Sequence, residues 1–306
     1  RSAESLDVFW IDRDGTVWSR RYEGTPGKER WLRSRPISPA RAAAKDSRLT
    51  AVANGPERLD VFWVGADQEI WRQWWEARDG ESWDRRRAQS VAPKRAVALG
   101  SSVAAVRRAP DKLDLFWVGS DGAIARQWWE ASEGERRGPV AVTTDNVAIA
   151  GSQLTAISRD RDQLDVFWVE PLGTIQQWSL VSFEQGGSRA NKPAQLTPFP
   201  VAAAGSQITA ISRETDQIEI FWVGNAGAIK MNWWKAGGTW RGPLPIRSDR
   251  KPAPGTSISA VARVDESVDL FWVTHDGAIA WQWADGAAGE GWSSHESALF
   301  TPEVAE

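Results

Sequence analysis

One five-residue phrase recurs six times along this chain, at intervals of 50 to 54 residues. Each copy has an aliphatic residue, an acid, a second aliphatic residue, phenylalanine and tryptophan, and the copies begin at Leu6, Leu59, Leu113, Leu164, Ile218 and Val268. Because β-branched and aromatic residues favour strands, a repeat of this period indicates a series of small sheets. The six modules fill the length of the chain, so we predict a single domain spanning residues 1–306.

Residues 207–246 show how one module is built. Residues 207–213 alternate apolar and polar side chains, 218–224 are apolar on both faces, and 228–236 and 240–246 follow after turns. Four antiparallel strands per module, repeated radially, describe a propeller blade. We therefore predict an all-β fold, a six-bladed β-propeller with four-stranded antiparallel blades.

Two local features refine this prediction. Three modules carry Asp-Gly between the second and third strands, at Asp14-Gly15, Asp121-Gly122 and Asp276-Gly277, which indicates tight hairpins with positive φ at both positions. Segments typical of the first, inner strand occur near residues 49–53, 102–107, 153–158, 207–212 and 257–262. That is five inner strands for six modules, so we expect the first blade to lack one.

Composition excludes several classes of function. The formal net charge is −3, which gives no support to a nucleic-acid partner, and no apolar stretch reaches the roughly twenty residues that a membrane helix needs. The absence of cysteine removes disulfides, thiolate zinc sites and thiol catalysis. We expect no cofactor and no metal. The compartment is not fixed, with a secreted or extracellular location favoured, and the oligomeric state stays open.

The acid in the recurring phrase has two possible roles. The six copies are Asp7, Asp60, Asp114, Asp165, Glu219 and Asp269. They could form a ring of carboxylates around a metal or substrate. They could equally be structural, bonded to backbone N–H groups or to Arg107, Arg159, Arg213 and Arg263. A buried carboxylate must be paired, and six equivalent acids indicate repeated architecture, so we favour the structural role.

Tryptophan is the most unusual residue, with 21 copies against one tyrosine. Those that end the recurring phrase are predicted to lie in the core: Trp10, Trp63, Trp117, Trp168, Trp222 and Trp272. The third strands carry a second set, which we predict to be sugar-binding: Gln73, Trp74, Trp75, Gln127, Trp128, Trp129, Asn232, Trp233, Trp234, Gln282 and Trp283. Gln177-Trp178 is a shortened version of the same triplet.

The chemistry of these triplets suits a carbohydrate. The C–H face of a sugar ring packs on an indole, while amides, carboxylates and guanidinium groups bind its hydroxyls. Neighbouring strand residues point to opposite faces, so one tryptophan of each pair can pack while the other faces a cleft. For Trp75, Trp129 and Trp234, packing between blades and sugar binding both stay open. The second, third and fifth modules should form the best sites, because the first and fourth lack the full triplet.

Catalysis is not indicated. The only histidines are His275 and His295, and no nucleophile elbow, phosphate loop or metal-ligand spacing is present. A glycosidase could act with two carboxylates alone, but no unique acid pair stands out from the repeat. We predict that the chain is not an enzyme.

The phrase that combines LDVFWVG, a DG turn and QWW resembles the repeat of the PLL-like β-propellers, the family of the Photorhabdus lectins. The resemblance extends from Leu6 to about Pro302. It implies a propeller that binds fucose- or galactose-type sugars between neighbouring blades. Lectins of that family have seven blades, whereas six modules are present here, and the six-bladed fungal fucose lectins are a second comparison.

These observations predict a multivalent, lectin-like propeller that binds glycans or glycoconjugates in clefts between blades, without catalysis or membrane insertion. The alternative is a non-catalytic protein-interaction scaffold, or a targeting module of a larger protein, in which the tryptophans are purely structural.

Overall fold

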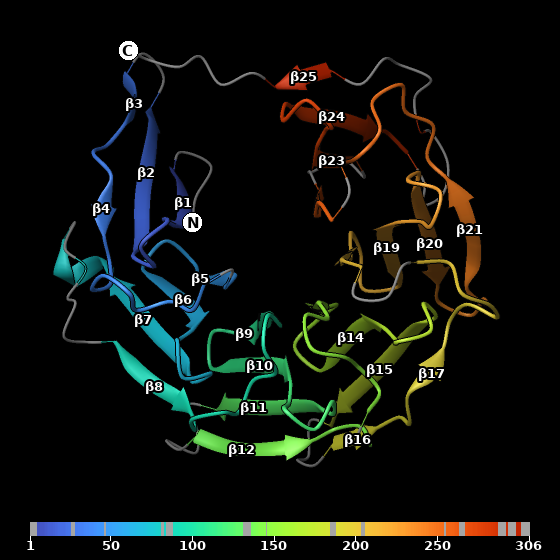
Figure 1. Ribbon diagram of the computed structural model, residues 1–306, viewed down its shortest axis with the longest axis horizontal. Helices are drawn as coiled ribbons and strands as arrows, with labels where there is room; N and C mark the ends of the chain where they lie inside the picture. The colour runs from blue at the N-terminus through green and yellow to red at the C-terminus, as the bar shows by residue number, and fades with distance from the viewer. Residues whose placement is uncertain are drawn as a thin grey trace. The chain divides into compact units, whose positions relative to one another are not determined.

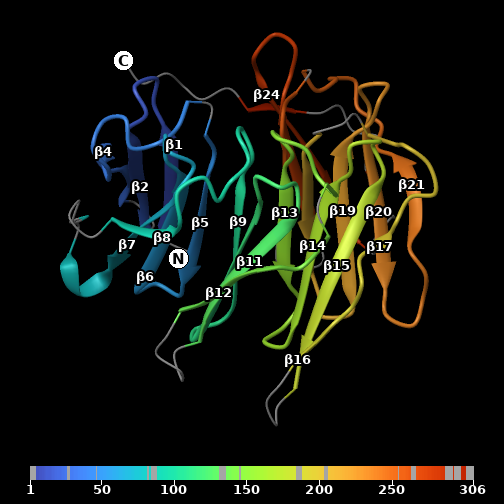
Figure 2. The ribbon, with the colours of Figure 1, turned by 60° about the horizontal axis from the view of Figure 1, so that its bottom comes forward.

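The computed structural model describes residues 5–25, 28–45, 47–80, 83, 88–130, 136–144, 146–183, 188–202, 206–253, 255–262, 267–286, 292 and 298–300. The chain divides into two compact units, Arg1–Gly151 and Ser152–Glu306, which are described separately. The described residues form six antiparallel sheets, three in each unit (Figures 1 and 2). None of the described residues belongs to a helix of the length and apolarity needed to cross a membrane.

The first unit contains three blades. The first has β1 (Ser5–Ile11), β2 (Val17–Thr25), β3 (Lys28–Trp31) and β4 (Arg35–Pro36). The second has β5 (Leu49–Asn54), β6 (Arg58–Val64), β7 (Ile70–Glu76) and β8 (Gln89–Ala92), with the 3₁₀ turn η1 (Ala77–Asp79) after β7. The third has β9 (Val103–Ala109), β10 (Lys112–Val118), β11 (Ile124–Glu130) and β12 (Arg136–Ala141).

The second unit also contains three blades. The fourth blade has β13 (Leu154–Ser158), β14 (Gln163–Val169), β15 (Ile175–Ser182), β16 (Ser188–Ala190) and β17 (Ala194–Gln195). The fifth has β18 (Ile208–Ile211), β19 (Gln217–Val223), β20 (Ile229–Lys235) and β21 (Arg241–Pro245). The sixth has β22 (Ile258–Ala262), β23 (Val268–Val273), β24 (Ile279–Ala284) and β25 (Ala298–Phe300).

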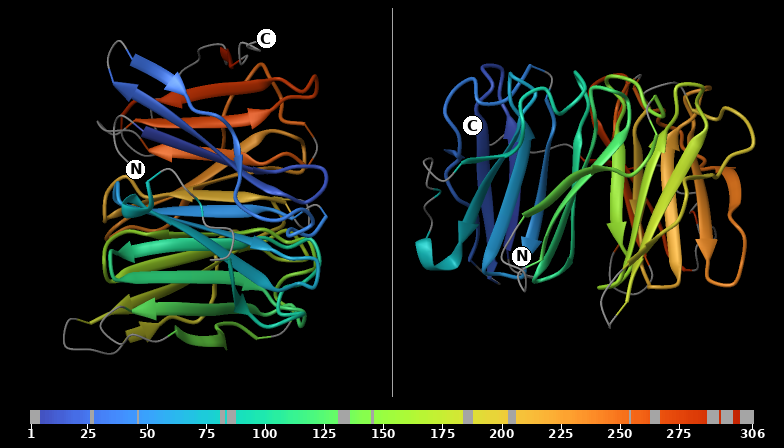
Figure 3. Two further views of the ribbon diagram at one scale, coloured as in Figure 1. Left: turned by 90° about the vertical axis from the view of Figure 1, so that its left-hand side faces the viewer. Right: turned by 90° about the horizontal axis from the view of Figure 1, so that it is seen from below.

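The strands of each blade pair antiparallel with the strand next to them in sequence, except that β4 pairs with β2 and β17 with β15 (Figure 3). The recurring phrase lies on the second strand position of every blade, and the tryptophan triplets lie on the third. This is the blade construction of a six-bladed β-propeller, so the predicted fold class is confirmed.

The first blade is incomplete, as the inner-strand count predicts. Its sheet starts at β1, and β3 and β4 both pair with β2 and share the outer position. No described strand lies beside β1 on its other edge. The prediction that Trp10 lies in the core is therefore wrong: it is only half-buried, because no inner strand covers it, and it stacks on Trp18 at 6.3 Å. The other five phrase tryptophans are at most 1% exposed, so their core assignment is confirmed.

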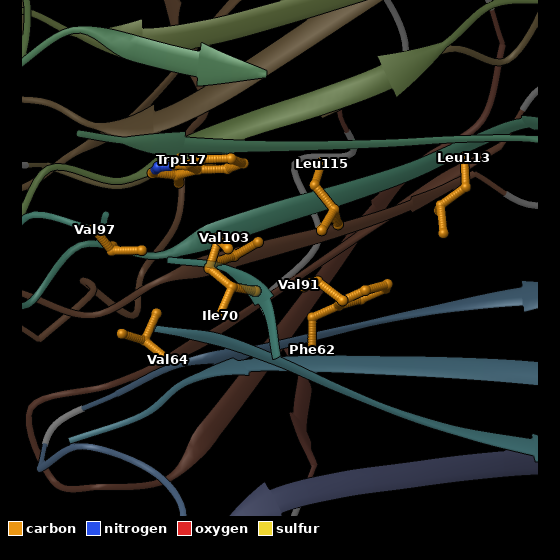
Figure 4. Packing of buried hydrophobic residues seen from close by; sticks show 10 residues of the cluster. Phe62, Val64, Ile70, Val91, Val97, Val103, Leu113, Leu115 and Trp117 are labelled. Carbon is orange, nitrogen blue, oxygen red and sulfur yellow. The ribbon is translucent and has the colours of Figure 1, made fainter. Parts of the chain in front are cut away.

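Neighbouring blades of one unit share their cores. Phe62, Val64 and Ile70 of the second blade pack against residues of β9 and β10 in the third. Figure 4 shows Leu115 and Trp117 pointing across this boundary toward the second blade. The fourth and fifth blades, and the fifth and sixth, share equivalent clusters. The alternation along β6 and β19 thus buries one face of each strand against the preceding blade and the other against the following blade.

The Asp-Gly turns differ in detail from the prediction. Gly15, Gly122 and Gly277 have φ of 79°, 78° and 84°, but the aspartates before them are not in the positive-φ region. In the first blade, Gly15 N donates to Asp12 O and Asp12 N donates to Thr16 O, which closes a three-residue loop. Such a loop needs positive φ at its last position only, and Gln68 with φ 63° occupies that position in the second blade.

Candidate functional site

The recurring acid is a structural residue wherever it is buried among arginines. Asp114 is fully buried, and its Oδ1 accepts hydrogen bonds from Nε and Nη2 of Arg126 at 2.8 and 2.5 Å. Its Oδ2 accepts from Nε of Arg108 at 2.7 Å. Equivalent ion pairs are Arg159–Asp165 at 2.7 Å and Arg213–Glu219 at 2.9 Å. The structural role is confirmed for these acids, while Arg263 lies outside the described residues.

Burial lowers the pKa of two arginines that are paired with these acids, Arg126 and Arg107. Desolvation lowers the pKa of Arg126, and the charge of Asp114 opposes that shift. Asp60 contacts three guanidinium groups, those of Arg72 at 2.5 Å, Arg107 at 2.6 Å and Arg58 at 3.3 Å. Arg107 belongs to β9, so this ion pair joins the second and third blades. Burial also lowers the pKa of Arg107, and the negative charge of Asp60 opposes that shift.

The triplet amides are buried and face the preceding blade. Gln127 Nε2 donates to Val91 O at 2.6 Å, and Gln73 Nε2 donates to Ile37 O at 3.4 Å. Gln282 Nε2 donates to Arg247 O at 2.8 Å. Asn232 is only 2% exposed. The three glutamine amides stabilise the contact with the segment before their blade, and a role for Gln73, Gln127, Asn232 and Gln282 in sugar binding stays a prediction.

The second tryptophan of each triplet lies under an arginine of the preceding blade. The pairs, with the distance from guanidinium carbon to ring centroid, are Arg21–Trp75 (4.8 Å), Arg72–Trp129 (5.6 Å) and Arg159–Trp234 (5.2 Å). Trp75 is 4% exposed, and its Nε1 donates to Gly80 O at 2.6 Å. Trp129 and Trp234 are half-buried. Packing between blades is thus observed for all three rings, and sugar binding by them stays a prediction.

The first tryptophan of each triplet points to the opposite face. Trp74 and Trp128 are half-buried, with the guanidinium groups of Arg72 and Arg126 over their rings at 5.3 and 4.4 Å. In the fifth blade the position of these arginines is taken by Met231, which pairs with Phe221. No described cation lies over the ring of Trp233, which is half-buried.

The sixth and fourth blades depart from the triplet pattern. Trp283 is half-buried and stacks on Trp281 at 4.7 Å. The sequence equated Gln177-Trp178 with the triplet, but β15 is one residue out of that register. Trp178 pairs with Val166, the position that Gln73 holds opposite Val61, and it is buried. The fourth blade therefore has Ser179 where Trp74, Trp128 and Trp233 lie.

The fifth blade contains a pocket of about 340 Å³ beside Trp233. Trp233 lines this pocket and also packs against the core shared with the sixth blade. Four residues with polar side chains also line the pocket: Gln217, Lys235, Thr239 and Arg241. Arg241 is directly opposite Trp233 in the β20–β21 pairing. We call this cavity the Trp233 pocket.

Sequence reasoning found Trp233 but missed its polar neighbours. Gln217 and Lys235 pair at one end of the β19–β20 hairpin, and Thr239 and Arg241 come from the turn and strand that follow. The sequence does distinguish the fifth blade at Lys235, because the corresponding residues in the first three blades are acids: Glu23, Glu76 and Glu130. Gly237 and Gly238 mark the turn that opens the pocket.

A second cavity, of about 440 Å³, lies between the first two blades. Its wall includes Trp71 and Trp63, with Pro39, Ala42 and Ala66 beside them. Trp71 is a tryptophan that the triplet pattern does not include. The described residues contain no cluster of three or more His, Asp or Glu side chains that could hold a metal ion.

No protein-family model matches this chain, and no curated protein matches its sequence. Solved structures do resemble it. The BP39L lectin from Burkholderia pseudomallei is 23% identical, with 98% of this chain and 81% of that one covered at a TM-score of 0.83. AofleA from Arthrobotrys oligospora is 16% identical, with 97% and 83% covered at 0.71.

A third structure is the lectin from Aleuria aurantia in complex with Fucα1-6GlcNAc. It is 19% identical, with 98% of this chain and 94% of that one covered at a TM-score of 0.64. The same lectin has been described as a six-bladed β-propeller with its own mode of fucose recognition. At these identities the likeness establishes the propeller fold of the chain.

Proposed function

We propose that this chain is a multivalent, non-catalytic carbohydrate-binding protein of the lectin type. The Trp233 pocket is the observation that carries the proposal, because it combines an accessible indole with amide, hydroxyl and cationic groups around one cavity. Its volume falls in the range of ligand pockets, roughly 300–1,000 Å³. An indole face with a few polar groups at its rim is the chemistry that binds a sugar ring and its hydroxyls.

The structural neighbours support the same class of ligand. The lectin from Aleuria aurantia has been crystallised with fucosides, and SapL1 lectin with α-methyl fucoside. We propose fucose- or galactose-type sugars as ligands, and membership of the PLL-like lectins, on the basis of the repeat. The half-buried rings of Trp74 and Trp128 are candidates for further, weaker sites, since guanidinium groups already cover one face of each. Several weak sites on one scaffold would raise avidity for a glycan-coated surface.

The proposal is tested by a glycan array followed by titration in solution with fucose and galactose. We expect saturable binding that weakens in Trp233→Ala. The control is Trp31→Ala, which removes a 44% exposed indole that does not line the pocket and should leave binding unchanged. An array without any bound glycan, together with a defined protein partner, would instead support an interaction scaffold.

A further inference from the structure

We propose that the Trp233 pocket binds a sugar carrying an anionic group, a carboxylate or a sulfate, rather than a neutral sugar. This inference rests on the proposed carbohydrate binding and narrows the ligand at the same site. It comes from a reversal of charge at one repeat position and from the cations that line the pocket.

The reversal of charge is at the end of the third strand. Glu76 pairs with Arg58 and Glu130 pairs with Lys112, so the second and third blades each place an acid opposite a base. In the fifth blade the same pair is Lys235 and Gln217. The fifth blade therefore has the base Lys235 where the second and third blades have an acid, and the neutral amide Gln217 where they have a base. The fourth blade has Gln163 and Val181 at this position and the first has Ser5 and Glu23, so among these described pairs only the fifth blade ends its third strand with a base.

The pocket lining is correspondingly cationic. Lys235 and Arg241 are both exposed and line the cavity, and no acid is among its described lining residues. The nearest carboxylate to Lys235 is that of Asp216, whose Oδ2 is 4.0 Å from Nζ. This pair is 65% and 40% exposed, so it is weak and leaves the ammonium accessible. The carboxylate of Glu214 is bonded to Gln217 instead, since its Oε2 accepts a hydrogen bond from Gln217 Nε2 at 3.4 Å.

The third blade provides an internal comparison. Its first tryptophan, Trp128, pairs with Arg137, just as Trp233 pairs with Arg241. There, however, Glu130 occupies the position of Lys235, and its Oε1 is 3.9 Å from Nη2 of Arg108. An anionic ligand would meet this carboxylate in the third blade, and would meet an ammonium in the fifth.

Geometry gives each group a part in recognition. The indole of Trp233 can support the ring, Gln217 and Thr239 can bind hydroxyls, and Lys235 and Arg241 bring two cations to the lining of the cavity. Hydrogen bonds to an ionised acceptor are about twice as strong as neutral ones, and arginine binds carboxylate and sulfate oxygens through two N–H groups. Two cations in the lining therefore give the site its selectivity for an anionic substituent.

The experiment compares three ligands of one ring type by calorimetric titration of the intact chain: galactose, galacturonic acid and galactose 6-sulfate. We expect at least one acidic ligand to bind about ten- to a hundredfold more tightly than galactose, with a preference that declines as salt rises. The two acidic ligands distinguish a carboxylate from a sulfate as the group recognised. Inorganic sulfate is the control for the anion alone, and it should bind far more weakly than the sulfated sugar.

Variants locate the preference. Lys235→Glu recreates the residue of the first three blades, so it should abolish the preference for the acidic ligands while galactose still binds. The reciprocal Glu130→Lys should add preference for an acidic ligand at the third blade. Equal binding of galactose and both acidic ligands, or inorganic sulfate binding as tightly as the sulfated sugar, would overturn this inference and leave carbohydrate binding intact. Absence of binding by all three sugars would overturn this inference, and absence of fucose binding in addition would overturn the proposed function as well.

Discussion

At the scale of single residues, the buried tryptophans act as polar anchors as well as apolar filling. Nε1 of Trp117 donates to Ala96 O at 3.1 Å, and Nε1 of Trp63 donates to Ala42 O at 3.2 Å. Trp222 and Trp272 make the same bond, to Val201 O at 3.4 Å and Arg250 O at 2.9 Å. Each acceptor lies in the segment that leads into its blade, so one side chain both fills the core and holds the incoming chain.

The buried acids give the first prediction. Asp114→Ala leaves the guanidinium groups of Arg108 and Arg126 buried without their carboxylate. We expect this change to lower the free energy of unfolding by about 3–5 kcal/mol. Asp7→Ala is the matched change in the first blade, where Arg21 is 3.4 Å away and 18% exposed. It should cost less than Asp114→Ala, because its ion pair with Arg21 is longer and the guanidinium is more exposed. Urea denaturation measures both, and equal losses would contradict the paired-acid account.

At the scale of the elements, the hairpin turns differ in how much room they leave. An added Cβ at Gly122 would lie 2.7 Å from Ala148 O, whereas at Gly277 it would meet no heavy atom of the described residues within 4 Å. Both residues follow an aspartate and have similar positive φ. The same dipeptide therefore lies in two different surroundings, which its local sequence does not distinguish.

The second prediction uses this pair. Gly277→Ala should cost only the strain of a non-glycine residue at positive φ, about 1 kcal/mol. Gly122→Ala adds a backbone clash and should cost about 1–3 kcal/mol more. Thermal unfolding of the two variants is the measurement, and a Gly277→Ala protein as unstable as Gly122→Ala would show that the clash is relieved.

The third prediction concerns pH. The Thr274 hydroxyl and then the Ala278 amide bind the carboxylate of Asp276, and they hold its pKa below the usual value. A group with a lowered folded pKa stabilises the fold above its unfolded pKa, and this contribution is lost as pH falls through the folded value. Asp276→Asn should therefore unfold at a lower temperature than the parent at pH 7, and this difference should shrink toward pH 2. A difference that stays constant with pH would be inconsistent with the carboxylate acting through its charge.

The strand pattern and the repeat were enough to predict the blades, the missing inner strand and five of six core tryptophans. The surroundings of the triplet rings were not predictable in this way. Arg72 covers Trp129 from 57 positions earlier in the chain, and Arg21 covers Trp75 in the same manner. Strand alternation predicts which face of the sheet each ring lies on. It does not predict which side chain of a neighbouring blade packs on that ring. For the same reason Trp10 was misassigned, since its exposure depends on an inner strand, and the described residues contain no such strand beside β1.

At the scale of the compact units, shared cores should make neighbouring blades unfold together. Phe62 is fully buried in a cluster that includes Leu113, Leu115 and Trp117 of the third blade. Phe62→Ala should lower the free energy of unfolding by about 3–5 kcal/mol, because it removes the packing of this ring from the cluster. Hydrogen exchange should then quicken in β10 as well as in β6. Faster exchange confined to the second blade would show that the blades of this unit are energetically independent.

The most direct measurement of the central claim is a nuclear magnetic resonance titration of the indole N–H signals of the 21 tryptophans. Trp233→Phe identifies the signal of the pocket residue. On addition of the sugars above, we expect the Trp233 signal to shift and saturate, while the signals of Trp63, Trp117, Trp222 and Trp272, which are bonded to backbone carbonyls, stay in place. An unchanged Trp233 signal at sugar concentrations that saturate binding elsewhere, or no shift of any indole, would contradict the account.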